Sequence, residues 1–166
     1  MGLLIIKRYF ERRQQKMYVR NISYTDFLGN KREDEFYFNL NKAEVIKWLT
    51  TTGDYTLDKV LQKVAKERNG KRIIEIFEDM LKMSYGKPSL DGIKFDKSDE
   101  IWDDFYRSNA YSELFTELVT DAAKAAEFIN KIIPKDLAEE VDKTIRSNPN
   151  LIPEEVKGAV TPTIVK

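Results

Sequence analysis

The chain has 166 residues, which suits a single domain, and 42% of them are hydrophobic, which is enough for a buried core. Its 28 basic and 28 acidic residues balance, so no net field draws it to nucleic acid or to an anionic membrane. Cysteine and histidine are both absent, which excludes disulfides, thiolate chemistry and histidine-based catalytic or zinc sites.

The first segment, residues 1–16, has a short apolar run followed by basic residues. The run is shorter than the roughly 7–15 apolar residues of a secretory signal and the roughly 20 of a membrane span. One interpretation is a basic arm that touches phosphate or lipid. We favour the other, an extension outside the fold with Met17 as the start of translation, and expect 1–16 to be disordered or loosely attached.

Alternating apolar residues next predict a β-hairpin, with residues 18–27 paired to residues 32–39 through a Gly-Asn turn. A lone hairpin is marginal in water, so its aromatic face should lie on helices or on another subunit. Phe36 and Phe38 share that face and are expected in the core. Tyr37 points to the opposite face and is a candidate partner contact.

Helical periodicity follows the hairpin. Asn41 begins a capping box before a helix at 42–50, and Thr56 caps a second helix with apolar residues from Leu57 onward. An Asn-Gly pair breaks the pattern, which resumes at Ile73 and stops at Gly86. A polar connection with an Asp-Gly turn and a short extended piece then leads to the second half of the chain.

Four further helices are predicted in the second half. Ser98 and Ser108 are candidate caps for two of them, Asp121 caps a helix at 122–133, and a thin apolar stripe continues beyond Pro134. Three prolines and the lack of a sustained period predict a mobile tail with at most a short helical turn.

These elements predict a mainly α fold, α+β by strict count. An N-terminal β-hairpin would pack on a compact bundle of about five to seven short helices. We expect residues 17–146 to form the domain and residues 147–166 to form the C-terminal tail.

No catalytic, cofactor or metal site is predicted. The acidic residues between Asp91 and Asp104 lack the spacing of a calcium loop, and the basic turn at 68–72 lacks that of a phosphate loop. No serine has a histidine partner for a triad. By elimination we expect a protein that works by contact.

The helices of the second half carry more apolar positions than short helices ordinarily bury, and some of these are candidates for self-association or client binding. The alternative for each is packing in the domain core. These candidates are Tyr111, Phe115, Phe128 and Ile132.

Three stretches in order, YTDFLGNKREDEFYFNLNKAEV, MSYGKPSLDGIKF and AYSELFTELVTDAAKAAEFINKIIP, resemble the tail assembly chaperones of long-tailed bacteriophages, especially those of Gram-positive hosts and their prophages. The resemblance spans roughly residues 17–134. It implies a protein made in the host cytoplasm and absent from the finished virion. It also implies two partners, the long helical tape measure protein, which is coated and kept soluble, and the major tail tube protein, whose subunits are recruited around it. In many such phages a ribosomal frameshift adds a second domain to some copies.

Other function classes stay open at this stage. A structural tail component, such as a completion or connector protein, is one alternative. A small helical DNA-binding regulator is another, although no predicted helix has a one-sided basic face. An enzyme is the remaining alternative.

Overall fold

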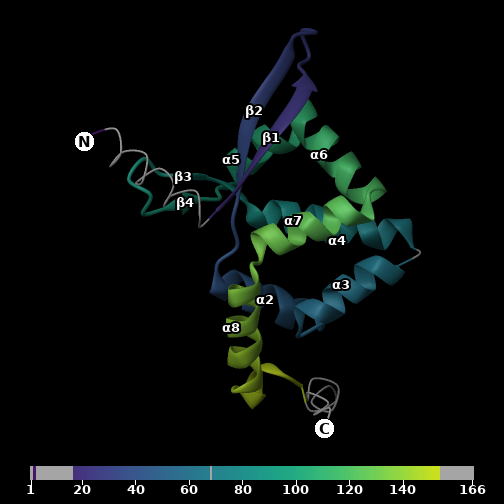
Figure 1. The fold of residues 1–166 in the computed structure, drawn as a ribbon, viewed down its shortest axis with the longest axis vertical. Helices are drawn as coiled ribbons and strands as arrows, with labels where there is room; N and C mark the ends of the chain where they lie inside the picture. The colour runs from purple at the N-terminus through teal and green to yellow at the C-terminus, as the bar shows by residue number, and fades with distance from the viewer. Residues whose placement is uncertain (1, 3–16, 68, 154–166) are drawn as a thin grey trace. The chain divides into compact units, whose positions relative to one another are not determined.

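The computed structural model describes residue 2 and residues 17–67 and 69–153. The expectations for residues 1–16, apart from Gly2, and for the tail beyond residue 153 lie outside these described residues. Seven α-helices and a four-stranded antiparallel sheet form the described part, which confirms the mainly α, α+β fold (Figure 1). In chain order the elements are β1 (Tyr18–Thr25), β2 (Lys31–Phe38), α2 (Lys42–Thr52), α3 (Leu57–Lys66), α4 (Gly70–Ser84), β3 (Tyr85–Pro88), β4 (Phe95–Asp96), α5 (Asp99–Tyr106), α6 (Asn109–Thr120), α7 (Ala122–Ile132), α8 (Lys135–Arg146) and the 3₁₀ turn η1 (Pro149–Leu151).

The chain divides into two compact units. Unit 1 comprises Met1–Asn39 and Gly70–Ile132, and unit 2 comprises Leu40–Asn69 and Ile133–Lys166. The first therefore holds the whole sheet with α4, α5, α6 and α7, and the second holds α2, α3, α8 and η1. The domain at 17–146 and the tail at 147–166 that the sequence predicts are not tested by this division and stay predictions.

The predicted hairpin is the first feature of unit 1. β1 and β2 pair without interruption from Tyr18 opposite Phe38 to Thr25 opposite Lys31. Because side chains alternate across a strand, Phe36 and Phe38 share one face, and Tyr37 points to the other. Helices cover the Phe36 face, as expected: α6 packs on β1, and the Phe36 ring lies 5.1 Å from that of Phe105 on α5.

The strand β3 corrects the sequence prediction of a helix that runs to Gly86. Helix α4 ends at Ser84, and Tyr85 instead pairs with Phe38 of β2, followed by Gly86 with Tyr37. The apolar spacing continues smoothly through Tyr85, so periodicity alone could not show where the helix stops. The deciding contact comes from β2, far away in sequence, which takes up the backbone groups of Tyr85 and Gly86.

Unit 1 has a core built largely from aromatic rings. Phe38 lies at its centre, with ring centroids 5.2 Å from Phe128, 5.6 Å from Tyr85 and 6.0 Å from Phe105. Burial raises the pKa of Tyr85 to about 12, with a smaller contribution from Asp104, so this ring stays neutral. Aliphatic side chains from α4 and α6 complete the core, namely Met80, Leu81, Leu114 and Leu118.

Unit 2 contains three helices and the last described turn. Asn41 and Glu44 form the predicted capping box of α2, each side chain accepting from the other residue's backbone N–H at 2.9 Å. A salt bridge of 2.8 Å between Lys42 and Glu140 joins α2 to α8. After α8, η1 is the short turn that the sequence allowed, and Ile152 behind it is buried.

Candidate partner-binding surface

A run of four aromatic side chains on α5 and α6 is the leading candidate for a binding surface. We call Trp102, Tyr106, Tyr111 and Phe115 the aromatic ladder. Successive ring centroids lie 5.7 Å apart for Trp102 and Tyr106, 4.9 Å for Tyr106 and Tyr111, and 5.5 Å for Tyr111 and Phe115. The last two rings are stacked, and Trp102 also meets Tyr111 edge-on at 5.7 Å. Such contacts hold each ring in a fixed orientation.

The local sequence explains why these rings meet. On each helix the two ladder residues are four positions apart, so they lie on the same helix face. The hydroxyl of Ser98 accepts from Ile101 N–H to start α5, and the hydroxyl of Ser108 accepts from Tyr111 N–H to start α6. With only Arg107 and Ser108 between the helices, the end of α5 brings Tyr106 against Tyr111 at the start of α6.

The ladder lies at the boundary between the core and solvent. Trp102 is buried, Tyr111 and Phe115 are half-buried, and Tyr106 is 45% exposed. Burial is the main cause that raises the pKa of Tyr111, followed by the nearby charge of Glu78, so its hydroxyl keeps its proton at neutral pH. A neutral, partly exposed aromatic surface on rigid helices can receive apolar side chains of a partner.

Of the five contact residues predicted from the sequence, two lie in the aromatic ladder. Tyr111 and Phe115 stack in the ladder. Phe128 and Ile132 on α7 are 1% and 2% exposed, and the Phe128 ring packs on Tyr18 and Phe38 in the core of unit 1. Tyr37 is half-buried on the opposite sheet face, where its hydroxyl donates to Glu35 at 3.0 Å. Burial, and then this bond, raises the pKa of Tyr37.

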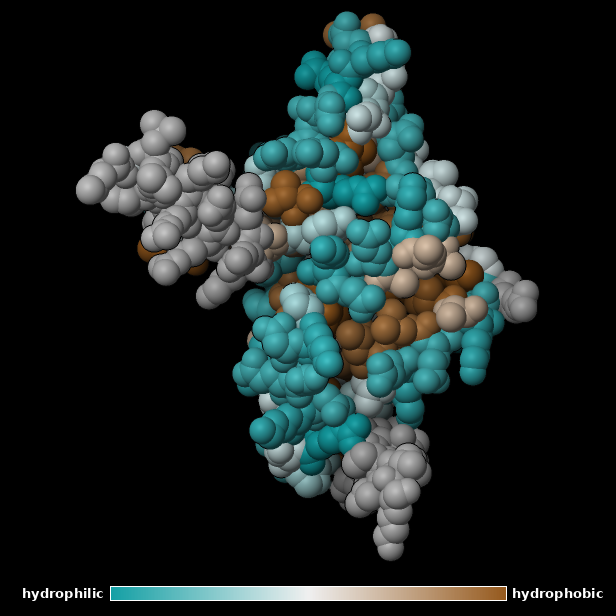
Figure 2. Space-filling view, viewed as in Figure 1, coloured by the Kyte–Doolittle hydropathy of each residue, from teal (hydrophilic) through white to brown (hydrophobic). Residues whose placement is uncertain are grey.

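Tyr106 was missed by the sequence reasoning, although its spacing four residues after Trp102 was a usable signal. Two exposed apolar tips were missed as well. Phe27 and Leu28, 78% and 88% exposed, occupy the turn between β1 and β2, where Figure 2 shows hydrophobic atoms at the tip of the hairpin. Leu90 and Ile93 are similarly exposed between β3 and β4. Apolar residues inside a turn sequence were the signal here, because turns are normally polar.

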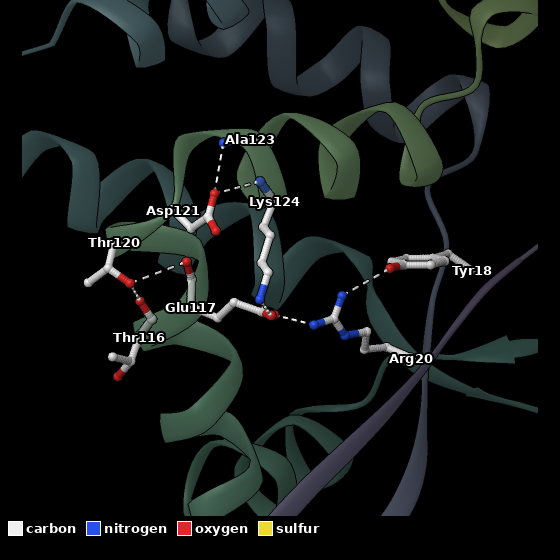
Figure 3. A network of polar contacts seen from close by, with 8 residues as sticks. All are labelled: Tyr18, Arg20, Thr116, Glu117, Thr120, Asp121, Ala123 and Lys124. Carbon is white, nitrogen blue, oxygen red and sulfur yellow. Dashed lines mark hydrogen bonds and ion pairs between the residues drawn. The ribbon is translucent and has the colours of Figure 1, made fainter.

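A polar network joins β1, α6 and α7 in unit 1 (Figure 3). The carboxylate of Glu117 accepts from Arg20 through one oxygen and from Lys124 at 2.7 Å through the other. Burial alone would lower the pKa of Arg20, but the Tyr18 hydroxyl and the Glu117 carboxylate outweigh it and raise that pKa. Asp121 accepts from two backbone N–H groups and so starts α7. The network fixes the position of α6 beside β1.

None of the helices within 17–67 and 69–153 combines the length and apolar character needed to cross a bilayer. Over the same ranges, no group of acidic side chains is arranged to hold a metal ion.

The family model of the phage tail assembly chaperone family matches residues 17–161 of this chain. No curated protein and no solved structure matches it. The matched range begins at Met17, where the sequence resemblance also begins, and includes both the ladder and the hairpin.

Proposed function

Since this chain belongs to the phage tail assembly chaperone family, we propose that it binds the tape measure protein, keeps it soluble and helps to recruit tail tube subunits around it. The family match over residues 17–161 is the observation that carries this proposal. On this account the protein acts in the host cytoplasm, during infection or prophage induction, and is left out of the mature virion.

The aromatic ladder supplies a surface suited to such a client. An amphipathic helix presents apolar side chains at positions i, i+3, i+4 and i+7, and these need a complementary apolar strip on the partner. Tyr106, Tyr111 and Phe115 form a strip of this kind, already ordered by their mutual contacts. A strip ordered before binding loses little side-chain entropy when the client arrives, which favours affinity.

Solubility of the complex follows from the surroundings of the ladder. Asp103 and Asp104 on α5, and Ser112 and Glu113 on α6, are exposed next to it in sequence. Once the ladder is covered, these side chains stay in water, and a client coated by several chaperone copies would present a charged exterior. This property would protect a long helix from aggregation until the tube subunits cover it.

Co-expression with the tape measure protein from the same phage genome tests the proposal. We expect the tape measure protein to be insoluble alone, and to move into the soluble fraction and co-purify when this chain is present. An unrelated helical protein of similar size and balanced charge serves as the control. A client that stays insoluble and does not co-purify would rule out the chaperone function.

A further inference from the structure

The strand β1 is one of the two outer strands of the sheet in unit 1, because the strand order among the described residues is β1-β2-β3-β4. Two hydrogen bonds show which of its backbone groups point outward. Asp26 N–H donates to Asn30 C=O at 2.9 Å, so even-numbered residues direct their backbone groups toward β2. Thr25 C=O instead accepts from the Asn109 side chain on α6 at 2.8 Å. The N–H and C=O groups of Asn21 and Ser23 therefore point away from the sheet.

These outward groups have no hydrogen-bond partner in the part of the chain that the structure describes. The strand also lacks the usual protection of an edge. Its sequence, YVRNISYT, contains no proline, and its pairing with β2 has no bulge. Its one charged side chain, Arg20, is held by Glu117 of α6 and does not guard the edge. The part of the edge at Asn21 and Ser23 is therefore a template for another strand.

A groove lies along this edge. It has a volume of about 440 Å³, and the consecutive residues Arg20, Asn21, Ile22 and Ser23 form one wall. Side chains on both faces of β1 and the backbone between them thus line it. The facing wall is α6, with Glu113, Thr116 and Glu117. At about 3.3 Å per residue, the β1 wall matches roughly four residues of an extended chain.

The charges of the groove indicate what kind of segment it accepts. Glu117 is already paired with Arg20 and Lys124, and Asp121 accepts from the backbone at the start of α7. Glu113 is exposed and forms no ion pair or hydrogen bond with any described residue. The two basic and three acidic side chains that line the groove therefore sum to one negative charge, and Glu113 is the carboxylate that a lysine or arginine of a bound segment would complement.

We propose that the β1–α6 groove binds an extended, basic peptide segment of another protein, which adds as a fifth strand. Its backbone exchanges hydrogen bonds with Asn21 and Ser23, and a lysine or arginine pairs with Glu113. Main-chain bonds give the affinity in this mode of recognition, and the pairing with Glu113 gives the selectivity. The inference does not depend on the proposed chaperone function, because none of the ladder residues lines the groove.

A displayed library of random ten-residue linear peptides, selected against the full chain, tests this site. We expect the enriched peptides to share a lysine or arginine. We also expect them to have no proline at the positions next to that basic residue. Their affinity, measured by fluorescence polarisation, should fall at least about ten-fold in Ser23→Pro, which removes an outward N–H, and stay within about two-fold in Ser23→Thr, which keeps it. Circular dichroism would confirm that both variants are folded.

Two further readouts keep the test decisive if Ser23→Pro does not fold. Bound peptide should slow amide exchange at Asn21 and Ser23 of the wild-type chain. Glu113→Lys should weaken binding of the basic peptide. A peptide with glutamate in place of the basic residue should bind the Glu113→Lys variant with the affinity recovered. The proposal is overturned if no peptide is enriched, if bound peptides protect other amides, or if sedimentation shows the edge occupied by a second copy of this chain.

Discussion

Asp26 holds together the turn that presents Phe27 and Leu28. Its carboxylate accepts from Arg32 Nε at 2.7 Å and from the backbone N–H groups of Leu28 and Asn30 at 3.0 and 2.9 Å. Gly29 completes the turn with a φ of 85°, a value that side-chain-bearing residues rarely adopt. One carboxylate thus fixes a loop whose apolar tip would otherwise favour disorder or collapse.

Asp26 also makes the hairpin sensitive to acid. Its hydrogen bond from Arg32 is the largest cause that lowers the pKa of Asp26 from 3.8 to about 2, followed by the bond from Asn30 N–H. Because the folded pKa is below the unfolded one, the unfolded chain binds the proton more readily. The stabilisation by Asp26 is therefore complete above about pH 4 and is lost as the pH falls through about 2.

A carboxyl titration by NMR measures the pKa of Asp26. We expect this residue to titrate near pH 2 in the wild-type chain. In Arg32→Gln the main cause is removed, so the pKa of Asp26 should rise toward 3.8. The acid-dependent part of the unfolding free energy should also be smaller in Asp26→Asn than in the wild type. An ordinary pKa for Asp26 in the folded wild-type protein would contradict the turn geometry.

At the scale of elements, the pairing of β3 with β4 depends on a missing side chain. A Cβ added to Gly86 would lie 2.6 Å from the carbonyl oxygen of Asp96 and 2.5 Å from a ring carbon of Phe95. Lys97 holds β4 in this place, since its ammonium donates at 2.7 Å to the carbonyls of Asn39 and Met83. The neighbouring backbone is thus anchored on both sides and cannot move away at low cost.

Gly86→Ala should therefore destabilise the protein, by roughly 1–3 kcal/mol as for other overpacked sites. Gly70→Ala is the matched control, because Gly70 begins α4 and no atom lies within 4 Å of a Cβ added there. This variant should be as stable as the wild type or more stable by up to about 1 kcal/mol. Urea denaturation of the two variants measures the difference. Equal stability of the two would mean that β4 does not approach Gly86 as closely as described.

The element scale also shows what the sequence could and could not predict. Helix starts were predictable, because Asn41, Thr56, Ser98 and Ser108 are local caps, and each caps its helix as expected. The end of α4 was not, because Tyr85 leaves the helix for a strand partner that lies 47 positions earlier, opposite Phe38. A helix cap depends on residues that are neighbours in sequence, whereas a strand pairing depends on a segment that is distant in sequence.

The same limit applies to the candidate contact residues at the scale of the whole molecule. Phe115 and Phe128 both lie on amphipathic helices, and their sequence surroundings do not distinguish them. The difference arises from tertiary packing, since α7 places Phe128 against the sheet, while α6 leaves Phe115 at the partly exposed end of the ladder. Burial removes a side chain from the surface that a partner can reach, so the ladder is the stronger candidate.

The ladder and the tip of the β1–β2 hairpin are both exposed apolar surfaces of unit 1, as are Leu90 and Ile93 between β3 and β4, and the first two differ in kind. The ladder is a row of four rings in contact on two helices, of which only the last two are stacked, whereas the tip of the β1–β2 hairpin offers two side chains on a narrow turn. Binding energy usually concentrates in aromatic residues within a surrounded patch, because such a patch can exclude water. We therefore propose the ladder, and not the hairpin tip, as the surface for the client.

The affinity of the chain for a purified, soluble helical fragment of the tape measure protein tests the central claim most directly. We predict that Tyr106→Ser combined with Phe115→Ser weakens binding about a hundred-fold or more, as expected for the loss of hot-spot residues. The matched control, Phe27→Ser combined with Leu28→Ser, removes a more exposed apolar pair and should stay within about three-fold of the wild type. Wild-type affinity in a folded ladder variant, or an equal loss in the control, would contradict the account.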